Sequence, residues 1–375
     1  MSGDVVIARA SRAAPRGRRS RAPGSATVTR KTPPFSADHE EAGTVRGDGR
    51  ELAVPWCQVT ARVARQVDFG AGHLWLDLDV SSGFEPPAPG QFVQLLLGST
   101  AAGTFLPRPM SVAGAVRRGR GLRLSFLYAP VGTGTRALAR LRAGDDVQAL
   151  GPLGRGYPIA APGTPVLVAG GRGVAPLLYV AAALARQRTG AAGANGAAGE
   201  PGGAGIARLG AGTPRPALAR HRATRRCEFL FGARTAPQLV GLAEVGRRIA
   251  RLEGALHVCT DDGSRGMRGT VVLLLERLAP GFALPIVIHA CGPHAMLRAV
   301  AEWAVARDIR AYLAMESVMA CGTGVCRGCP LPRSAAGIAA HSGAAPSLLG
   351  NREYAMCCTE GPVFEARELD WTRVA

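Results

Sequence analysis

Short apolar runs broken by Gly and Pro follow one another after residue 55. In several of them apolar and polar residues alternate with period two, which is typical of strands that bury one face. The runs span residues 58–63, 73–80, 91–97, 121–128 and 146–150. One helix is expected among them, over residues 135–142. The pattern predicts a small antiparallel β-barrel domain over residues 53–157.

The pattern changes near residue 164, where continuous apolar runs alternate with helical sequence. Strands are expected at 166–169, 227–231, 256–260 and 286–290, each followed by a turn and a helix. Buried strands that alternate with helices predict an α/β parallel-sheet nucleotide-binding domain, here over residues 158–310. A tract of Gly, Ala, Pro and Arg over 190–224 is expected to be a flexible insertion. Residues 1–52 have few bulky apolar side chains, which predicts a disordered leader.

Composition narrows the classes of function. The net charge is +18, but the basic residues are dispersed along the chain and aromatic residues make up 5% of it. Nucleic-acid-binding proteins more often cluster their charge and add aromatic side chains for stacking, so we expect no nucleic-acid partner. No apolar stretch reaches the length needed to span a membrane, and no export signal is apparent. We therefore expect a cytoplasmic protein with no membrane partner.

Cysteines are concentrated in residues 311–375, which we expect to form a small C-terminal module. A C-x4-C-x2-C run is followed by two adjacent cysteines; these thiols are Cys321, Cys326, Cys329, Cys357 and Cys358. The spacing is that of a plant-type 2Fe-2S site, which transfers single electrons. A zinc site usually pairs two short knuckles, and His341 is the one imidazole nearby. Adjacent side chains of an extended segment point in opposite directions, so one of Cys357 and Cys358 is a bystander, and the pattern leaves open which.

Two short motifs in the predicted barrel offer contacts to a flavin. The run Arg108-Pro109-Met110-Ser111 places a cation and a hydroxyl beside a proline-fixed backbone, which suits a flavin and its pyrophosphate. The same four residues also suit a surface loop. Gly134 and Thr135 lie at the start of the expected helix, where free N–H groups favour a phosphate and where Thr can also serve as an N-cap.

Two glycine-containing turns are expected at one edge of the parallel sheet. The first contains Gly171, Gly173 and Pro176, and the second is Cys291-Gly292-Pro293. Glycines at the carboxyl ends of parallel strands let a ligand approach the backbone closely. The first turn is not the G-x-G-x-x-G fingerprint, and either turn alone fits tight packing equally well. Together they favour a nicotinamide pocket.

The motifs in this order resemble the electron-transfer subunit of bacterial class 1B dihydroorotate dehydrogenase, within the ferredoxin-NADP reductase superfamily. The resemblance runs from about residue 55 to the end, and its most specific part is the cysteine spacing. It implies FAD contacts at Arg108, Pro109, Met110, Ser111, Leu127, Tyr128, Ala129, Gly134 and Thr135, and a 2Fe-2S cluster on Cys321, Cys326, Cys329 and Cys358. Two positions depart from the family pattern: Ala129 replaces a frequent Arg, and Arg172 replaces a usually apolar residue.

The resemblance implies a function that the residues alone do not give. FAD would exchange a hydride with NAD(H) and single electrons with the cluster, while a separate FMN-containing catalytic subunit oxidises dihydroorotate to orotate in pyrimidine (UMP) biosynthesis. The assembly would be a heterotetramer with two copies of each chain. Alternatives are a reductase subunit of a sulfide dehydrogenase, a hydrogenase diaphorase or a ferredoxin:NADP oxidoreductase, and a non-catalytic metal or nucleotide sensor. NAD and NADP are not distinguished, although Arg234 is a candidate for contact with a 2′-phosphate.

Overall fold

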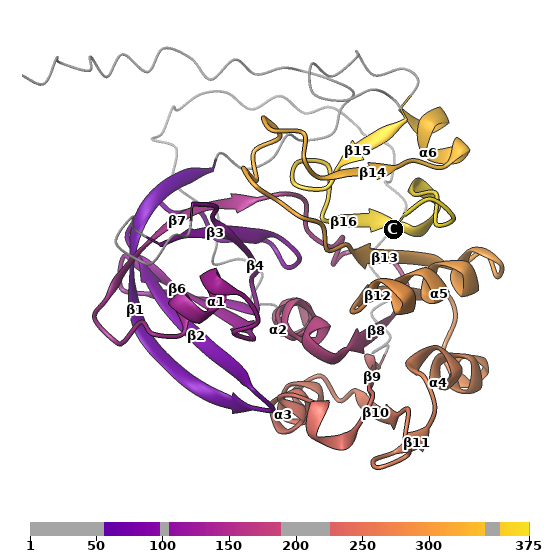
Figure 1. Cartoon of the computed structure of the whole chain (residues 1–375). Coiled ribbons are helices and arrows are strands. Elements are labelled where there is room, and N and C mark those ends of the chain that lie inside the picture. Colours follow the sequence, from indigo (N-terminus) through magenta and orange to yellow (C-terminus); the bar gives the residue numbers. More distant parts are fainter. Residues whose placement is uncertain (1–55, 98–104, 189–225, 342–352, 375) are drawn as a thin grey trace, which may run out of the picture. The chain divides into compact units, whose positions relative to one another are not determined.

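Two seven-stranded sheets form the framework of the described chain (Figure 1). The computed structural model describes residues 56–97, 105–188, 226–341 and 353–374. The predicted leader, 1–52, and the predicted insertion, 190–224, lie outside these residues. No helix in the described ranges is long and apolar enough to cross a membrane.

The first sheet is antiparallel throughout and corresponds to the predicted barrel. Its strand order is β4-β3-β7-β1-β2-β6-β5. The strands are β1 (Cys57–Gly70), β2 (His73–Val80), β3 (Phe92–Leu96), β4 (Arg108–Ser111), β5 (Gly114–Arg118), β6 (Gly121–Tyr128) and β7 (Asp146–Leu153), with helix α1 (Thr133–Leu138) before β7. Alternate residues such as Leu76, Leu78, Leu124 and Phe126 are fully buried inside it. The period-two strands are thus confirmed, whereas β4 and β5 lie outside the predicted runs.

The second sheet is parallel except for its last strand, in the order β11-β10-β9-β8-β12-β13-β16. The strands are β8 (Thr164–Gly170), β9 (Glu228–Ala233), β10 (Ala255–Thr260), β11 (Met267–Arg268), β12 (Ile286–Cys291), β13 (Arg310–Ala314) and β16 (Val363–Glu365). The helices that cover it are α2 (Val174–Arg188), α3 (Leu242–Arg251), α4 (Val271–Leu278) and α5 (His294–Val305). This confirms the predicted α/β arrangement.

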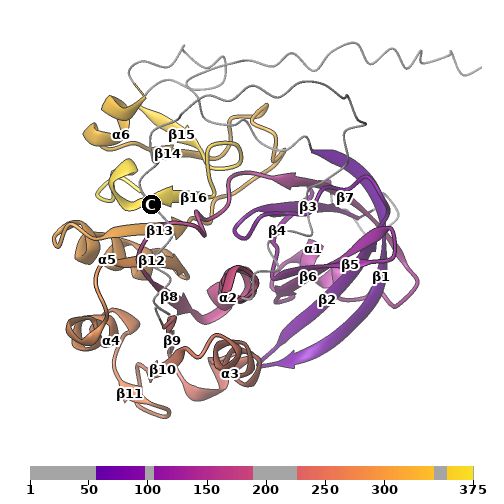
Figure 2. The same ribbon diagram turned by 180° about the vertical axis from the view of Figure 1, so that it is seen from behind.

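Alternation within the buried strands sends side chains to both faces of the second sheet. Along β8, Val166 and Val168 pack with α4 and α5, whereas Leu167 and Ala169 pack with α2 and α3. Figures 1 and 2 show α2 between this sheet and the barrel strands. Both faces are therefore buried, which explains the continuous apolar runs in the sequence.

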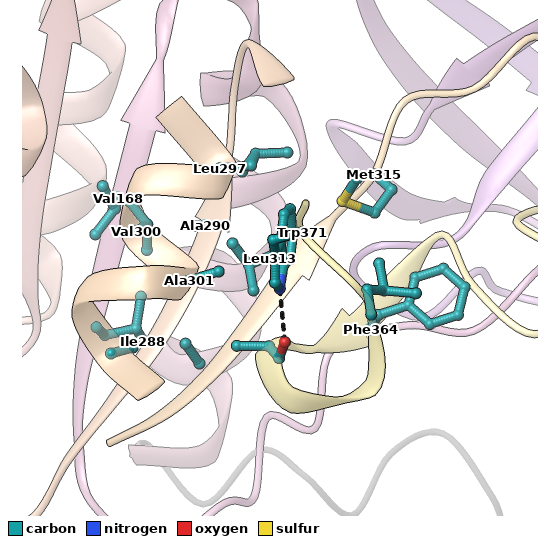
Figure 3. Packing of buried hydrophobic residues seen from close by; sticks show 14 of the residues in the cluster. Val168, Ile288, Ala290, Leu297, Val300, Ala301, Leu313, Met315, Phe364 and Trp371 are labelled. Atoms are coloured by element: carbon teal, nitrogen blue, oxygen red, sulfur yellow. Dashed lines mark hydrogen bonds between the residues drawn. The ribbon is translucent and has the colours of Figure 1, made fainter. Parts of the chain in front are cut away.

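The C-terminal segment completes the second sheet. It contains β14 (Pro330–Pro332), α6 (Ala335–Ala340) and β15 (Tyr354–Met356) before β16, which pairs antiparallel with β13. Trp371 packs beside Leu313 and α5, and its indole N–H donates to the carbonyl of Ala366 at 2.7 Å (Figure 3). The boundary predicted between residues 310 and 311 therefore cuts β13, because the sheet continues into the cysteine-rich segment.

Two tyrosine hydrogen bonds link segments that adjoin the antiparallel sheet to the α/β layer. The hydroxyl of Tyr157, which follows β7, donates to the carbonyl of Ala290 in β12 at 2.8 Å. The hydroxyl of Tyr179 in α2 donates to the carbonyl of Pro87, in the loop between β2 and β3, at 2.7 Å. Both tyrosines are buried.

Candidate functional site

A cavity of about 250 Å³ lies between the antiparallel sheet and the parallel sheet. Nine residues predicted from the sequence line it: Pro109, Met110, Ser111, Leu127, Tyr128, Ala129, Thr135, Pro176 and Cys291. They come from β4, β6, α1, α2 and β12, so the fold brings both sets of motifs to one place. We call this space the flavin cavity. A mostly apolar cleft with a few polar groups is the usual form of a cofactor site.

Several residues of the flavin cavity were missed by the sequence reasoning. They are Phe92, Val131, Arg172, Ala175, Met315, Glu316, Ser317, Met319 and Pro362. Phe92 belongs to β3. Residues 315–319 connect the end of β13 to the first cysteine of the loop, Cys321. Pro362 lies four residues after Cys358, and the fold brings it to the cavity.

Arg108 and Gly134 lie against each other beside the flavin cavity. The guanidinium of Arg108 donates to the carbonyls of Leu106 and Pro107, at 2.9 and 3.2 Å. A Cβ atom on Gly134 would lie 1.9 Å from Nε of Arg108, so any larger residue would require the guanidinium to shift. The cation lies next to the segment for which the resemblance implies flavin contacts.

Thr135 acts as a capping residue. Helix α1 begins at Thr133, so Thr135 is its third residue. The Thr135 hydroxyl accepts a hydrogen bond from the backbone N–H of Gly132 at 3.0 Å and donates to the Gly132 carbonyl at 3.1 Å. The N-cap is therefore Gly132 and not Thr135, whose hydroxyl instead serves the capping box from the third helical position.

A larger cavity, of about 730 Å³, opens at the carboxyl edge of the parallel sheet. It is lined by residues at the ends of β8, β9, β10 and β12, namely Gly170, Gly171, Gly232, Ala233, Asp261 and Pro293, and also by Arg172 and Arg234. We call it the nucleotide cavity, because ligands of open α/β sheets bind at this edge. Arg172 lines both cavities. The position that departs from the family pattern therefore lies at the junction of the two cavities.

Gly173 and Gly292 have a different role from Gly171. A Cβ atom on Gly173 would lie 2.0 Å from the carbonyl oxygen of Cys291, and one on Gly292 would lie 2.6 Å from Cε of Met296. Neither glycine lines a cavity among those described. Their lack of a side chain lets the two turns pack closely, which is the alternative that the sequence had left open.

Backbone N–H groups surround the sulfur atoms of the cysteine loop. The N–H groups of Thr323 and Cys326 both donate to Sγ of Cys321 at 3.4 Å, and Gly328 donates to Sγ of Cys326 at 3.4 Å. Burial raises the pKa of the Cys321 thiol, but these donors outweigh it and lower the pKa to about 6. The loop is therefore built to hold negative sulfur.

Cys357 and Cys358 face different surroundings. The thiol of Cys357 is fully buried, lies 3.8 Å from the carbonyl oxygen of Met315, and has a pKa raised by burial. Cys358 shares a side-chain hydrogen bond with Cys329, which lowers the pKa of Cys329 to about 7 and raises that of Cys358. The backbone N–H of Cys358 also donates to Sγ of Cys329 at 3.4 Å. Cys358 thus faces the loop and Cys357 faces the core.

The four loop-facing thiols are arranged as two pairs. Cys321 hydrogen-bonds to Cys326, and Cys329 to Cys358. Within the described ranges, no three His, Cys, Asp or Glu side chains are arranged to hold a single metal ion. A 2Fe-2S cluster instead takes two ligands on each of two irons. Two thiol pairs with N–H donors around them are compatible with that arrangement of ligands.

The flavin cavity and the cysteine loop share continuous stretches of chain. Met319 lines the cavity and precedes Cys321 by two residues, and Pro362 lines it and follows Cys358 by four. Because a chain extends by at most about 3.5 Å per residue, the Cα atoms of Met319 and Cys321 are within about 7 Å of each other. A group bound in the cavity and a group held by the cysteines would be near neighbours.

Comparisons with known proteins agree with this geometry. The chain is 32% identical over 286 residues to the dihydroorotate dehydrogenase B (NAD(+)), electron transfer subunit of Geobacillus thermodenitrificans, covering 75% of this chain and 86% of that protein. The protein of the same name from Desulforamulus reducens is 29% identical over 286 residues, covering 76% and 87%. No family model matches the chain.

The fold also has a counterpart among solved structures. The structure of an NADH-dependent reduced ferredoxin-NADP oxidoreductase superposes with a TM-score of 0.60 and 23% identity, over 84% of this chain and 91% of that one. At this identity the likeness concerns the fold, which is therefore ferredoxin-reductase-like. By its identity to the curated relatives over most of their length, the chain belongs to the family of dihydroorotate dehydrogenase B (NAD(+)) electron transfer subunits.

Proposed function

We propose that this chain carries electrons between a dihydroorotate-oxidising partner subunit and NAD⁺, by way of a 2Fe-2S cluster and FAD. The observation that carries the proposal is that the flavin cavity shares Arg172 with the nucleotide cavity and is also lined by Met319 and Pro362, which are close in sequence to the proposed cluster ligands. FAD supplies the exchange between two-electron hydride chemistry and one-electron chemistry. The protein's own residues bind and orient the three groups.

The flavin would be held by β4, β6 and α1. The segment Pro109-Met110-Ser111 forms one wall of the flavin cavity and Leu127-Tyr128-Ala129 another. Arg108, seated on Gly134, supplies a fixed positive charge for the pyrophosphate. The frequent family Arg is Ala129 here, and the cavity contains Arg172 as another cation.

The nicotinamide cofactor would enter through the nucleotide cavity. Gly171 has a φ of +51°, a conformation that favours glycine in the turn after β8, and both Gly171 and Pro293 line this space. Arg172 reaches both cavities, so it can bind the cofactor where it approaches the flavin. Pro176 and Cys291 line the flavin side of that junction.

The cluster would be bound by Cys321, Cys326, Cys329 and Cys358. The thiolate form is the metal ligand, and N–H donors that lower the pKa of Cys321 and Cys329 prepare these thiols for it. No residue of this chain needs to contact the pyrimidine. The partner would be an FMN-containing catalytic subunit in a cytoplasmic heterotetramer of two copies of each chain, acting in UMP synthesis.

Co-expression with that catalytic subunit tests the proposal. The purified complex is expected to contain FMN, FAD and iron, and to reduce NAD⁺ when dihydroorotate is added. Cys358→Ser should abolish this activity, whereas Cys357→Ala, the matched control on the adjacent residue, should retain it. Full activity of Cys358→Ser, or a complex that forms with a different flavoprotein in place of the FMN subunit, would contradict the proposal.

A further inference from the structure

Gln94 is a buried amide without a partner. It lies in the middle of β3, is 0% exposed, and neither its Nε2 nor its Oε1 atom has a hydrogen-bond partner among the described residues. Buried polar side chains are nearly always paired in folded proteins, so an unpaired one needs an explanation. A bound group that the chain is built to receive is one such explanation.

The position of Gln94 in β3 directs it out of the barrel. Val93 and Leu95 belong to the barrel core, and alternation sends Phe92 and Gln94 to the opposite face. Phe92 lines the flavin cavity, but Gln94 does not. Gln94 thus shares a face of β3 with Phe92 and pairs across the sheet with Pro109, which also lines the flavin cavity, but Gln94 itself is not part of that lining.

The cysteine loop covers Gln94. A Cβ atom on Gly322 would lie 2.8 Å from Cγ and 2.9 Å from Nε2 of Gln94, and 3.0 Å from Cδ1 of Leu153. Gly322 follows Cys321 directly and has a φ of +78°, a conformation that favours glycine. The absence of a side chain at Gly322 leaves room for the amide directly against the loop that carries three of the four proposed ligands.

We propose that the side-chain amide of Gln94 donates a hydrogen bond to the iron–sulfur cluster and raises its reduction potential. This inference rests on the proposed function. The loop itself supplies backbone donors to Cys321 and Cys326, whereas Gln94 supplies a donor from the sheet that holds the flavin. Hydrogen bonds to cluster sulfurs stabilise the more negative, reduced state and so raise the potential. Gln94 would be a positioning and tuning residue that links the flavin-binding sheet to the cluster.

Gln94→Met tests the inference, because methionine has a similar length and no N–H donor. The full chain in complex with its catalytic subunit would be titrated anaerobically, with the cluster followed by EPR and the flavins by absorbance. We expect the one-electron reduction equilibrium of the cluster to become about tenfold less favourable, a fall of about 59 mV. The EPR g-values should shift with it, and the potential of FAD should stay the same.

A matched control lies on the neighbouring strand. Gln148 in β7 donates to the hydroxyl of Thr60 at 2.8 Å, so its amide already has a partner. Gln148→Met makes the same chemical change in the same sheet and should leave the cluster potential unaltered. If Gln94→Met does not fold, Gln94→Asn withdraws the amide by one methylene and should lower the potential in the same direction.

The outcomes separate the inference from the proposed function. A wild-type complex without a 2Fe-2S signal would remove the proposed function and the inference together. A normal wild-type cluster whose potential and g-values are unchanged by Gln94→Met or Gln94→Asn would overturn the inference alone. A shift in the FAD potential with no change at the cluster would also overturn it, because the amide would then act on the flavin.

Discussion

Glu360→Gln should destabilise the segment that carries Cys358. Glu360 forms an ion pair with Arg333, whose side chain is 3% exposed, and its other carboxylate oxygen accepts a hydrogen bond from the N–H of Met356 at 2.6 Å. Glutamine keeps the size of the side chain but removes its charge, so the guanidinium would stay buried without its counter-ion. Removing one partner of a buried ion pair costs about 3–5 kcal/mol.

The expected loss in the free energy of unfolding lies at the low end of that range. Glu360 itself is 28% exposed, so water screens part of the interaction. A loss of about 3 kcal/mol lowers the Tm by about 6–12 °C on the scale of a domain of roughly 150–250 residues. The assay is thermal unfolding followed by circular dichroism. Wild type and variant should be compared at equal FAD and iron contents, because bound cofactors add to the apparent stability.

An exposed ion pair provides the control for burial. Glu302 and Arg298 are four residues apart in α5, with Nε and Oε1 at 2.8 Å and side chains 55% and 47% exposed. Glu302→Gln should change the stability by less than about 1 kcal/mol. If the two variants unfold at the same temperature, the reasoning that burial gives the Arg333 pair its importance is refuted.

Three further changes probe the separate sites. Gly134→Ala should displace the Arg108 guanidinium and weaken FAD binding about tenfold, while the iron content stays the same. Equilibrium dialysis measures the FAD affinity. An affinity equal to that of the wild type would contradict the steric argument. In cluster-free protein at pH 7, iodoacetamide should alkylate Cys321 and spare Cys357. The rate of Cys321 alkylation should fall below about pH 6, because the thiolate is then protonated. Peptide mass spectrometry distinguishes the two cysteines. Asp261→Ala should raise kcat/KM for NADPH relative to NADH, because a carboxylate in the nucleotide cavity repels a 2′-phosphate; an unchanged ratio would count against this role.

The alternation of apolar and polar residues was sufficient to predict a strand where alternate side chains face an apolar interior. The run at 73–80 matches β2 residue for residue, because Leu76, Leu78 and Val80 face the apolar interior of the first sheet and alternate with Asp77 and Asp79. Strand β4, Arg108–Ser111, is four residues long and contains a proline, so no periodicity is visible there. A strand at the end of a sheet tolerates proline, and only its pairing with β3 reveals it.

The glycines show where sequence reasoning reaches its limit. Gly134, Gly173 and Gly292 all stand in motifs, and the sequence alone cannot say whether a glycine faces a ligand or a neighbouring segment. The structure separates them by what a Cβ atom would meet: a guanidinium at Gly134, a backbone carbonyl at Gly173 and a methionine at Gly292. These neighbours come from distant parts of the chain, so the answer depends on tertiary packing.

The same dependence on packing decides how the three sites connect. The cysteine spacing and the glycine turns are local features, but the segment between β13 and Cys321 has no periodic pattern that would mark Met315 or Met319 as part of the flavin cavity. These residues line it because β13 joins the parallel sheet beside β12, and the chain must then pass the barrel to reach Cys321. Arg172 lines both cavities because β8 is the neighbour of β12. The order of strands in one sheet therefore sets the order in which the nucleotide cavity, the flavin cavity and the cysteine loop meet.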